Sequence, residues 1–468
     1  MVLGRDARTW WRHARRLLPD RLPDWDRLEG QLKAFGETLL DRRLKIAVTG
    51  LSRSGKTVFI TSLAHHLERG VGLPFLNAVA DRRYLGAVPA RHVPAGITPF
   101  PYHAHHAALA GEVPYWPAAS TDLSLLRLEL RFKPRGRMAR QLGDKRTLTL
   151  DIVDYPGEWL IDLPLLEESY AGWAGVTLGR LAAEPYRGPM AAFFDALRDG
   201  DADAVVRAYV EGLEACRRER LSLLQPGRAL TPTAVEGAPE AALFAPVPAD
   251  HPLAGRFRAR FETYVERWVR PFKTHVVDAV DRQIVLVDVL ESLNRGPAHF
   301  DDTRAALALV LEGFNHGRSS YWQRLLAPKV EKLVFCATKA DHVANTQHAN
   351  LKLLLQDMVD DAARRVQLEG IPTDALAVAA LRSTDTVRTH YDGQLLSCVR
   401  GVPVASGKEK IVFPGEVPPT MPRGADWNEQ HFDFRRFAPR RLDGRQRNGH
   451  GHIRLDQVLE AVIGDRLG

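Results

Sequence analysis

The strongest chemical signal in the chain is a short run of glycine, serine, lysine and threonine. Residues 50–57 read GLSRSGKT and fit the pattern G-x-x-x-x-G-K-[ST]. The glycines let the backbone wrap a phosphate chain, and the helix expected next presents its positive end to the same phosphates. Lys56 is a mobile cation for the β- and γ-phosphates, and the Thr57 hydroxyl is a ligand for Mg²⁺. The predicted phosphate-binding residues are Gly50, Ser52, Arg53, Ser54, Gly55, Lys56, Thr57 and Val58.

A second motif, Asp154-Tyr-Pro-Gly157, follows a predicted strand. A carboxylate here can hold the Mg²⁺ shell, and the glycine amide can sense a γ-phosphate, which makes the next segment a switch. D-x-x-G is common by itself, but its position one predicted hairpin after the phosphate loop strengthens the signal. We therefore predict Asp154 as a metal ligand alongside Thr57, and Gly157 as a catalytic residue alongside Lys56.

A third motif distinguishes one base from another. Residues 338–341 read TKAD and resemble the [NT]-K-x-D element of guanine-nucleotide proteins. Asp341 can accept hydrogen bonds from the guanine N1–H and 2-amino group, while the stem of Lys339 can lie along the base. Thr338 opens the motif, and a later turn at Ala380 and Leu381 can offer a backbone N–H to the guanine O6. We predict all five as nucleotide-binding residues.

These motifs need a scaffold, and the sequence predicts strands that end at each of them. Helical segments at 58–68, 304–325 and 347–369 separate several of the strands. Strands that alternate with helices indicate an α/β fold with a mostly parallel sheet, and strands 123–132 and 146–154 can pair as a hairpin. The predicted strands are 43–50, 123–132, 146–154, 283–289, 332–338 and 376–381.

The chain of 468 residues is long enough for more than one compact unit. The block 158–280 has helical periodicity and no convincing strand, so we expect a helical insertion in the α/β domain. The text after residue 396 is rich in glycine and proline and predicts loops with short strands. The expected organisation is a basic helical segment 1–42, a nucleotide domain in two parts, 43–157 and 281–395, the insertion 158–280, and a C-terminal extension 396–468 that ends in a helix.

Composition excludes several classes of protein. Hydrophobic residues make up 45% and charged residues 26%, which excludes a wholly disordered chain or a coiled-coil rod. No stretch approaches the roughly 18 apolar residues that span a bilayer. Three scattered cysteines are too few for a disulfide framework and suggest a reducing compartment. The net charge of +7 admits anionic partners without naming one.

The order of phosphate loop, D-x-x-G and TKxD is that of GTPases. The segments GLSRSGKT, VDYPGEWLIDLP, RQIVLVD with NRGP, TKADHV and the closing HIRLD…IGD together resemble the YcjX-like family of bacterial P-loop GTPases. The resemblance covers about residues 40–468. It implies a Ras-like nucleotide domain with insertions, GTP or GDP with Mg²⁺ as ligands, and a stress-linked cytoplasmic protein that is sometimes encoded beside a small membrane protein.

Two positions depart from the common GTPase pattern. Many GTPases place a glutamine directly after D-x-x-G to orient the attacking water, but Glu158 stands here. A carboxylate is repelled by the γ-phosphate, so we expect slow hydrolysis, with Glu158 turned outward or engaged by an arginine. The hydroxyl that closes on Mg²⁺ is expected before strand 123–132. Ser120 and Thr121 are the best placed and Thr98 is the second choice, with ordinary loop hydroxyls as the competing interpretation.

Three functions stay open at this point. The favoured one is a molecular switch with slow Mg²⁺-dependent GTP hydrolysis. The alternatives are a nucleotide-gated interaction module with negligible turnover, which Glu158 favours, and an ATP-dependent kinase or ATPase, which needs no guanine-reading aspartate.

Two arginine-rich segments, 1–22 and 435–447, could bind a membrane surface, although charged surface is the simpler interpretation of both. Nucleic acid is not favoured as a partner. The expected location is therefore the cytoplasm, with a peripheral position at the inner membrane as a further option.

Overall fold

The structure is a computed structural model that describes most of the chain. The described residues are Leu32 and 43–51, 53–90, 93, 97–118, 122–135, 145–198, 201–230, 243–315, 330–368, 370–391, 393–429, 432–442 and 451–468. The predicted basic segment 1–42 lies outside them apart from Leu32, as do Ser52, Ser120 and Thr121. The chain divides into two compact units, one containing Glu158–Val277 and the other formed by Thr38–Gly157 with Asp278–Gly468.

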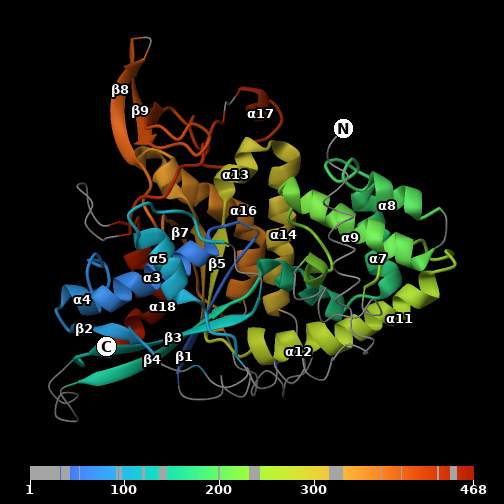
Figure 1. Ribbon diagram of the computed structural model, residues 1–468, viewed down its shortest axis with the longest axis horizontal. Helices are drawn as coiled ribbons and strands as arrows, with labels where there is room; N and C mark the ends of the chain where they lie inside the picture. The colour runs from blue at the N-terminus through green and yellow to red at the C-terminus, as the bar shows by residue number, and fades with distance from the viewer. Residues whose placement is uncertain are drawn as a thin grey trace. The chain divides into compact units, whose positions relative to one another are not determined.

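A seven-stranded sheet organises the second unit (Figure 1). Its order is β2-β3-β4-β1-β5-β6-β7, and the five strands from β4 to β7 run parallel. β2 and β3 are antiparallel, and β3 with β4 forms the predicted hairpin. The predicted α/β fold with a mostly parallel sheet is therefore confirmed. The strands are β1 (Leu44–Gly50), β2 (Tyr84–Pro89), β3 (Ser124–Phe132), β4 (Arg146–Asp154), β5 (Arg282–Val287), β6 (Lys332–Ala337) and β7 (Thr373–Ala377).

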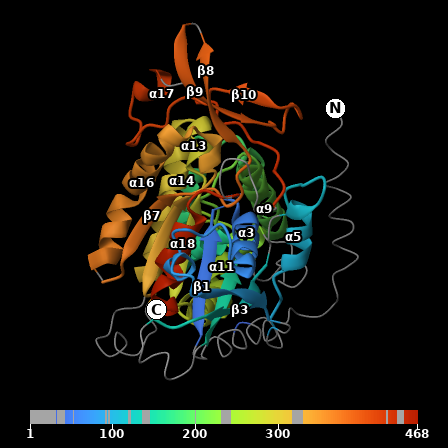
Figure 2. The same cartoon turned by 90° about the vertical axis from the view of Figure 1, so that its left-hand side faces the viewer.

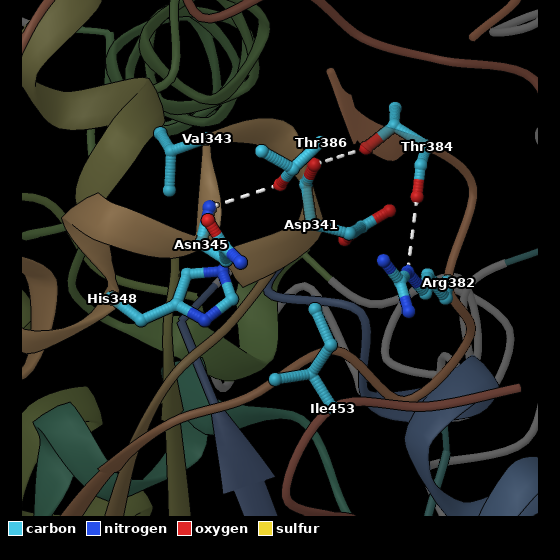
Figure 3. A pocket seen from close by; sticks show the side chains of 8 residues that line it. All are labelled: Asp341, Val343, Asn345, His348, Arg382, Thr384, Thr386 and Ile453. Atoms are coloured by element: carbon cyan, nitrogen blue, oxygen red, sulfur yellow. Dashed lines mark hydrogen bonds between the residues drawn. The ribbon is translucent and has the colours of Figure 1, made fainter. Parts of the chain in front are cut away.

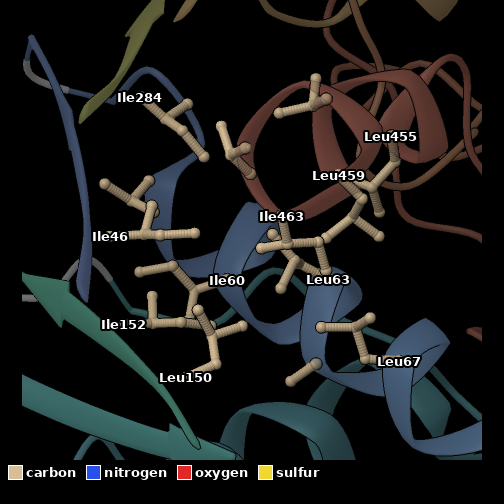
Figure 4. Close-up of a cluster of buried hydrophobic side chains, with 14 of the residues drawn as sticks. Ile46, Ile60, Leu63, Leu67, Leu150, Ile152, Ile284, Leu455, Leu459 and Ile463 are labelled. Carbon is tan, nitrogen blue, oxygen red and sulfur yellow. The ribbon is translucent and has the colours of Figure 1, made fainter. Parts of the chain in front are cut away.

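One face of the sheet is covered by α3 (Lys56–Arg69) and α18 (Leu455–Ile463), as Figure 4 shows. Alternate strand residues such as Ile46, Ile152 and Ile284 are buried there together with leucines of both helices. The central strand β1 is buried at every position, because a central parallel strand has helices on both faces. This burial explains why its sequence is a nearly continuous apolar run. The last helix of the chain therefore belongs to the core of the nucleotide domain.

The other face carries a second helical layer. Leu333 and Phe335 of β6 alternate with Val334 and are equally buried, and α16 packs against β6 and β7. α14 packs in turn against α16, and Figure 2 shows these helices around the sheet from a second direction. The remaining helices of this unit are α4 (Asn77–Ala80), α5 (Tyr102–Ala110), α13 (Val289–Asn294), α14 (Pro297–Asn315), α16 (His348–Leu368) and α17 (Asp426–Glu429).

A small antiparallel sheet follows β7, in the order β10-β9-β8. Its strands are β8 (Asp385–Tyr391), β9 (Gln394–Gly401) and β10 (Lys410–Val412), and β8 and β9 form a projecting hairpin in Figure 1. The sequence predicted short strands only in the C-terminal extension after residue 396, which contains β10 and part of β9 but not β8. It also placed the preceding strand at 376–381, whereas β7 ends at Ala377. The apolar run continues past the strand because Val378, Ala379 and Leu381 are also buried, although they lie outside β7. Burial therefore extends further along the chain than the strand does.

The described arginines of the basic cluster near the C-terminus are largely engaged within the chain, whereas Arg445 and Arg447 lie outside the described residues. Arg435 pairs with Asp433, Arg436 with Glu291, and Arg440 with Asp385. Membrane binding through these residues stays a prediction, and none of the helices in the described part of the chain is both long and apolar enough to cross a membrane.

The unit containing Glu158–Val277 consists of helices joined by loops, and no strand occurs among its described residues. A 3₁₀ segment, Gly157–Leu166, leads into it, and aromatic side chains such as Trp173, Phe244 and Phe261 pack in its interior. Its helices are α7 (Tyr170–Leu181), α8 (Ala191–Ala196), α9 (Ala202–Arg218), a 3₁₀ turn Gly227–Leu230, α11 (Ala254–Tyr264) and α12 (Arg270–Phe272), with π-helical turns at Val265–Val269 and Lys273–Val277.

Candidate nucleotide-binding site

The predicted phosphate loop joins the carboxyl end of β1 to the N-terminus of α3. β1 ends at Gly50 and α3 begins at Lys56, with Gly55 at a φ of +91°. That backbone conformation favours glycine, and it turns the chain into the first helical N–H groups, where an anion is best held. The Ser54 N–H donates to the Leu51 carbonyl at 3.1 Å, which tightens the loop. Arg53, exposed at the tip, has a φ of +63°.

The D-x-x-G motif lies directly against this loop. A Cβ added at Gly157 would lie 2.2 Å from the Gly50 carbonyl oxygen and 3.2 Å from the Leu51 nitrogen. A Cβ added at Gly50 would lie 2.8 Å from the Leu286 carbonyl oxygen of β5. Both positions therefore require glycine for close approach of two backbones, a reason that the sequence pattern alone did not supply. The two predicted motifs form one site.

A buried ion pair links the same two motifs. Lys56 Nζ lies 2.8 Å from Asp154 Oδ1 and also donates to the Tyr155 carbonyl. Asp154 is fully buried, and within the described residues its Oδ2 atom accepts no hydrogen bond. Buried carboxylate oxygens beside the mostly buried Thr57 fit the hard oxygen ligands that Mg²⁺ prefers. The third predicted metal ligand, Ser120, lies outside the described residues, and Thr98 is exposed.

The TKAD motif follows β6 at the same edge of the sheet. Its backbone is held on both sides, since the Thr338 N–H donates to the Val287 carbonyl at 2.9 Å and the Ala340 N–H donates to the Val378 carbonyl at 3.0 Å. Asp341 is 4% exposed, and its Oδ2 accepts the Ser383 N–H at 2.7 Å. The carboxylate predicted to read a base is therefore held in a fixed orientation.

A pocket of about 260 Å³ borders Asp341 at the carboxyl ends of β6 and β7 (Figure 3). Ile453 and Val343 give it apolar walls, and Arg382 and Thr384 give it polar ones. Figure 3 shows hydrogen bonds from the Asn345 N–H to Thr386 and from Arg382 to the Thr384 carbonyl. The pocket borders Asp341 but is not lined by Lys339, Ala380 or Leu381. Its lining residues are Asp341, Val343, Asn345, His348, Arg382, Thr384, Thr386 and Ile453.

The remaining predicted residues, Ala380 and Leu381, lie in the turn after β7, which contacts the helix that follows the phosphate loop. Ser62 of α3 donates its hydroxyl to the Ala380 carbonyl, which ties the turn after β7 to the helix of the phosphate loop. Leu381 is buried beside Val58, so its side chain has a packing role.

His348 donates through Nε2 to the Ala340 carbonyl at 2.8 Å, and burial together with Arg454 lowers the pKa of His348 to about 4. His348 is therefore neutral at physiological pH.

Sequence reasoning missed three residues that touch the TKAD motif. Asp288, directly after β5, forms an ion pair with Lys339. Ser383 holds the Asp341 carboxylate, and the Thr384 hydroxyl donates to the Asp341 carbonyl. The only signal for Asp288 was its place near the end of the predicted strand 283–289, much as Asp154 ends the predicted strand 146–154.

Glu158 is the first residue of the helical unit, and its side chain is buried. Glu158 is 8% exposed and has no ion pair among the residues described, so the expectation of an outward or arginine-paired side chain is wrong. Within the unit, Gly227 packs against it so closely that a Cβ at Gly227 would lie 2.1 Å from the Glu158 carbonyl oxygen. The residue where many GTPases place glutamine is held by its own unit.

Four residues further along, Asp162 anchors the same segment. Asp162 accepts hydrogen bonds from the Tyr264 hydroxyl at 2.6 Å and the Gly227 N–H at 2.9 Å. Complete burial raises the pKa of Asp162 to about 7, although both hydrogen bonds favour the ionised form.

Comparison with known proteins decides the family of the chain. The profile of the YcjX-like family, DUF463, matches residues 44–467, which extends from β1 to the end of the last helix. This chain belongs to the YcjX-like family. A family member named Ras-like GTPase YcjX, from Escherichia coli (strain K12), is 39% identical over 469 residues, which cover 94% of this chain and 99% of the relative. A second Ras-like GTPase YcjX, from Shewanella oneidensis, is 34% identical and covers 91% and 95% of the two chains. The predicted family resemblance is confirmed.

Proposed function

We propose that this chain is a guanine-nucleotide switch that binds GTP and GDP with Mg²⁺ and hydrolyses GTP slowly. The observation that carries the proposal is the close approach of Gly157 to Gly50, because a γ-phosphate sensor must lie against the loop that holds the phosphates. The GTPase names of the relatives support the same chemistry. The resemblance to a stress-linked bacterial family supports a cytoplasmic role, where the three buried cysteines stay reduced.

Each phosphate-site residue has one role in this proposal. Lys56 neutralises the β- and γ-phosphates, while the helix N-terminus that follows Gly55 holds them through backbone N–H groups. Thr57 and Asp154 hold the Mg²⁺, which supplies charge neutralisation on the phosphates. Gly157 senses the γ-phosphate through its N–H.

The base is read at the opposite end of the site. Asp341 accepts the guanine N1–H and 2-amino group, the stem of Lys339 lies along the ring, and the turn at Ala380 and Leu381 offers a backbone N–H to O6. The fixed orientation of the Asp341 carboxylate favours guanine over adenine, which presents no matching pair of donors. This disfavours an ATP-dependent kinase or ATPase.

Slow turnover follows from Glu158. Its carboxylate cannot orient water against a charged γ-phosphate as glutamine does, and its own unit holds its backbone in place. Single-turnover hydrolysis with Mg²⁺ distinguishes a slow GTPase from a binding module with negligible turnover, since only the first converts bound GTP to GDP.

Base specificity gives the decisive test. In Asp341→Asn, the Asn oxygen is expected to accept the Ser383 N–H, so the amide NH₂ faces the base and opposes the guanine donors. We expect GTP affinity to fall about a hundredfold, or roughly 3 kcal/mol, and xanthosine triphosphate to bind better than GTP. Titration with both nucleotides, with ATP as a control, measures this. Unchanged GTP affinity would remove Asp341 from the site, and equal binding of ATP and GTP by the wild type would end the proposal.

A further inference from the structure

Asp288 occupies a position that joins two elements. It follows the last residue of β5 and is the N-cap of α13, where its Oδ1 accepts the Glu291 N–H at 3.3 Å. Its Oδ2 pairs with the Lys339 ammonium, which comes from the loop after the neighbouring strand β6. The Asp288 carboxylate is 12% exposed and the Lys339 side chain 25%, so this pair is largely shielded from solvent. One carboxylate thus binds both a helix end and the lysine of TKAD.

The backbone of Lys339 is restrained independently of its side chain. Lys339 has a φ of +59°, a left-handed conformation that a lysine adopts only when its surroundings hold it there. The hydrogen bonds of Thr338 and Ala340 to neighbouring strands provide that restraint. What remains free in principle is the long lysine side chain, which has more rotamers to lose than almost any other. The ion pair with Asp288 removes that freedom before any ligand arrives.

We propose that Asp288 is a positioning residue of the nucleotide site, which holds the Lys339 stem where a guanine ring can lie along it. This inference rests on the proposed function. Asp288 touches no edge of the base in this arrangement, so it contributes to affinity without contributing to the choice between bases. Asp341 is the residue that discriminates between the bases. A preorganised lysine binds more tightly because less side-chain entropy is lost on binding.

Asn is the informative substitution, because Asn and Asp are about equally good N-caps. Asp288→Asn keeps the cap of α13 and removes the charge that holds Lys339, whereas Asp288→Ala removes both. The matched control is Asp201→Asn, since Asp201 is the N-cap of α9 in the helical unit and accepts the Asp203 N–H. The measurements are the dissociation constants of the full chain for GTP, GDP and ITP with Mg²⁺, and the melting temperature without nucleotide.

We expect Asp288→Asn to weaken GTP, GDP and ITP by the same factor, about tenfold, with the melting temperature unchanged. ITP lacks the 2-amino group, so an unchanged ratio of GTP to ITP affinity separates positioning from base reading. In the background Lys339→Ala, adding Asp288→Asn should weaken binding no further. Asp201→Asn should leave all three affinities at their wild-type values.

Wild-type affinity in Asp288→Asn would overturn the inference while leaving the guanine-nucleotide function intact. A further loss in the Lys339→Ala background would also overturn it, because Asp288 would then act other than through Lys339. Failure of the wild type itself to bind GTP is the separate result that would remove the proposed function and this inference together.

Discussion

At the scale of single residues, Lys56 and Asp154 neutralise each other in a buried pair. In the proposed function, nucleotide binding separates this pair, because Lys56 then contacts the phosphates and Asp154 contacts Mg²⁺. A buried carboxylate without a cation is costly, so Mg²⁺ and nucleotide should bind together. The ion pair therefore couples metal binding to phosphate binding.

Lys56→Ala tests that coupling. We expect GTP binding to be lost, and stability to fall by about 3 kcal/mol because Asp154 becomes a buried unpaired charge. The double variant Lys56→Ala with Asp154→Asn should recover most of the stability without recovering binding. Urea denaturation and GTP titration of both variants check this. If Lys56→Ala bound GTP like the wild type, residues 50–57 would not be the phosphate site.

At the scale of elements, the segment after D-x-x-G is a buried 3₁₀ helix within the helical unit. Trp159 packs edge-on against Trp268, with a ring separation of 4.9 Å, and the Arg228 guanidinium lies 4.0 Å from the Trp268 ring. Gln225 donates through Nε2 to the Ile161 carbonyl at 2.7 Å. The loop around Gly227 therefore restrains the segment from both its backbone and its side chains.

Gly227→Ala should disturb this restraint. Its new Cβ would lie 2.1 Å from the Glu158 carbonyl oxygen, so the backbone next to Gly157 must shift. We expect a loss of stability of about 1–3 kcal/mol and a smaller difference between GTP and GDP affinity. Gly255→Ala, in α11 with open space around it, is the control and should keep wild-type stability or gain slightly. Equal melting temperatures and nucleotide affinities for the two variants would contradict this account of Gly227.

Asp162 makes the stability of the same element depend on pH. Burial raises the pKa of Asp162 from its ordinary value of 3.8 to about 7 in the folded state, so the folded state retains a proton that the unfolded state loses. The stability linked to that proton is fully present below pH 3.8 and is lost as the pH rises to about 7.

Asp162→Asn should cancel this dependence, because Asn does not titrate. Between pH 5 and 7 the variant should gain on the wild type by up to about 1.4 kcal/mol per pH unit, and the difference should level off above pH 7. Urea denaturation of both chains across this range measures the effect. A constant difference at every pH would show that Asp162 does not titrate between the two states.

At the scale of the whole molecule, the two compact units are joined by the chain at Gly157–Glu158 and at Val277–Asp278. Gly157, the proposed γ-phosphate sensor, is thus the last residue of one segment of the sheet unit, and Glu158 begins the helical unit. Any backbone movement at Gly157 on loss of the γ-phosphate passes first into Glu158 through the peptide bond. We therefore expect the helical unit to be the part of the chain whose conformation responds to the bound nucleotide.

Hydrogen exchange should detect that output. We expect the amides of 158–168, and then those of the helices beyond, to exchange at different rates with a non-hydrolysable GTP analogue and with GDP. The edge strand β2, which does not pair with β4, is an internal control. Identical exchange in both states would favour a rigid binding protein.

The sequence alone was sufficient to recognise the motifs whose predicted function depends on the local spacing of residues. The phosphate loop, D-x-x-G and TKAD were each readable because their chemistry needs fixed residue types within a few positions on one turn. The parallel sheet was readable for a similar reason, since strands buried on both faces become continuous apolar runs such as β1. The hairpin strands β8 and β9 lacked such a pattern, because much of their surface stays partly exposed.

Tertiary structure decided which of these residues meet. Asp288 reaches Lys339, 51 positions away, only because β5 and β6 are neighbours whose carboxyl ends share one edge of the sheet. Ser383 reaches Asp341 because β6 pairs with β7. Gly227 meets Glu158 through the packing of the helical unit, which leaves no trace in local spacing. Local periodicity encodes the elements, but contacts between their ends depend on strand order and packing, which are properties of the whole fold.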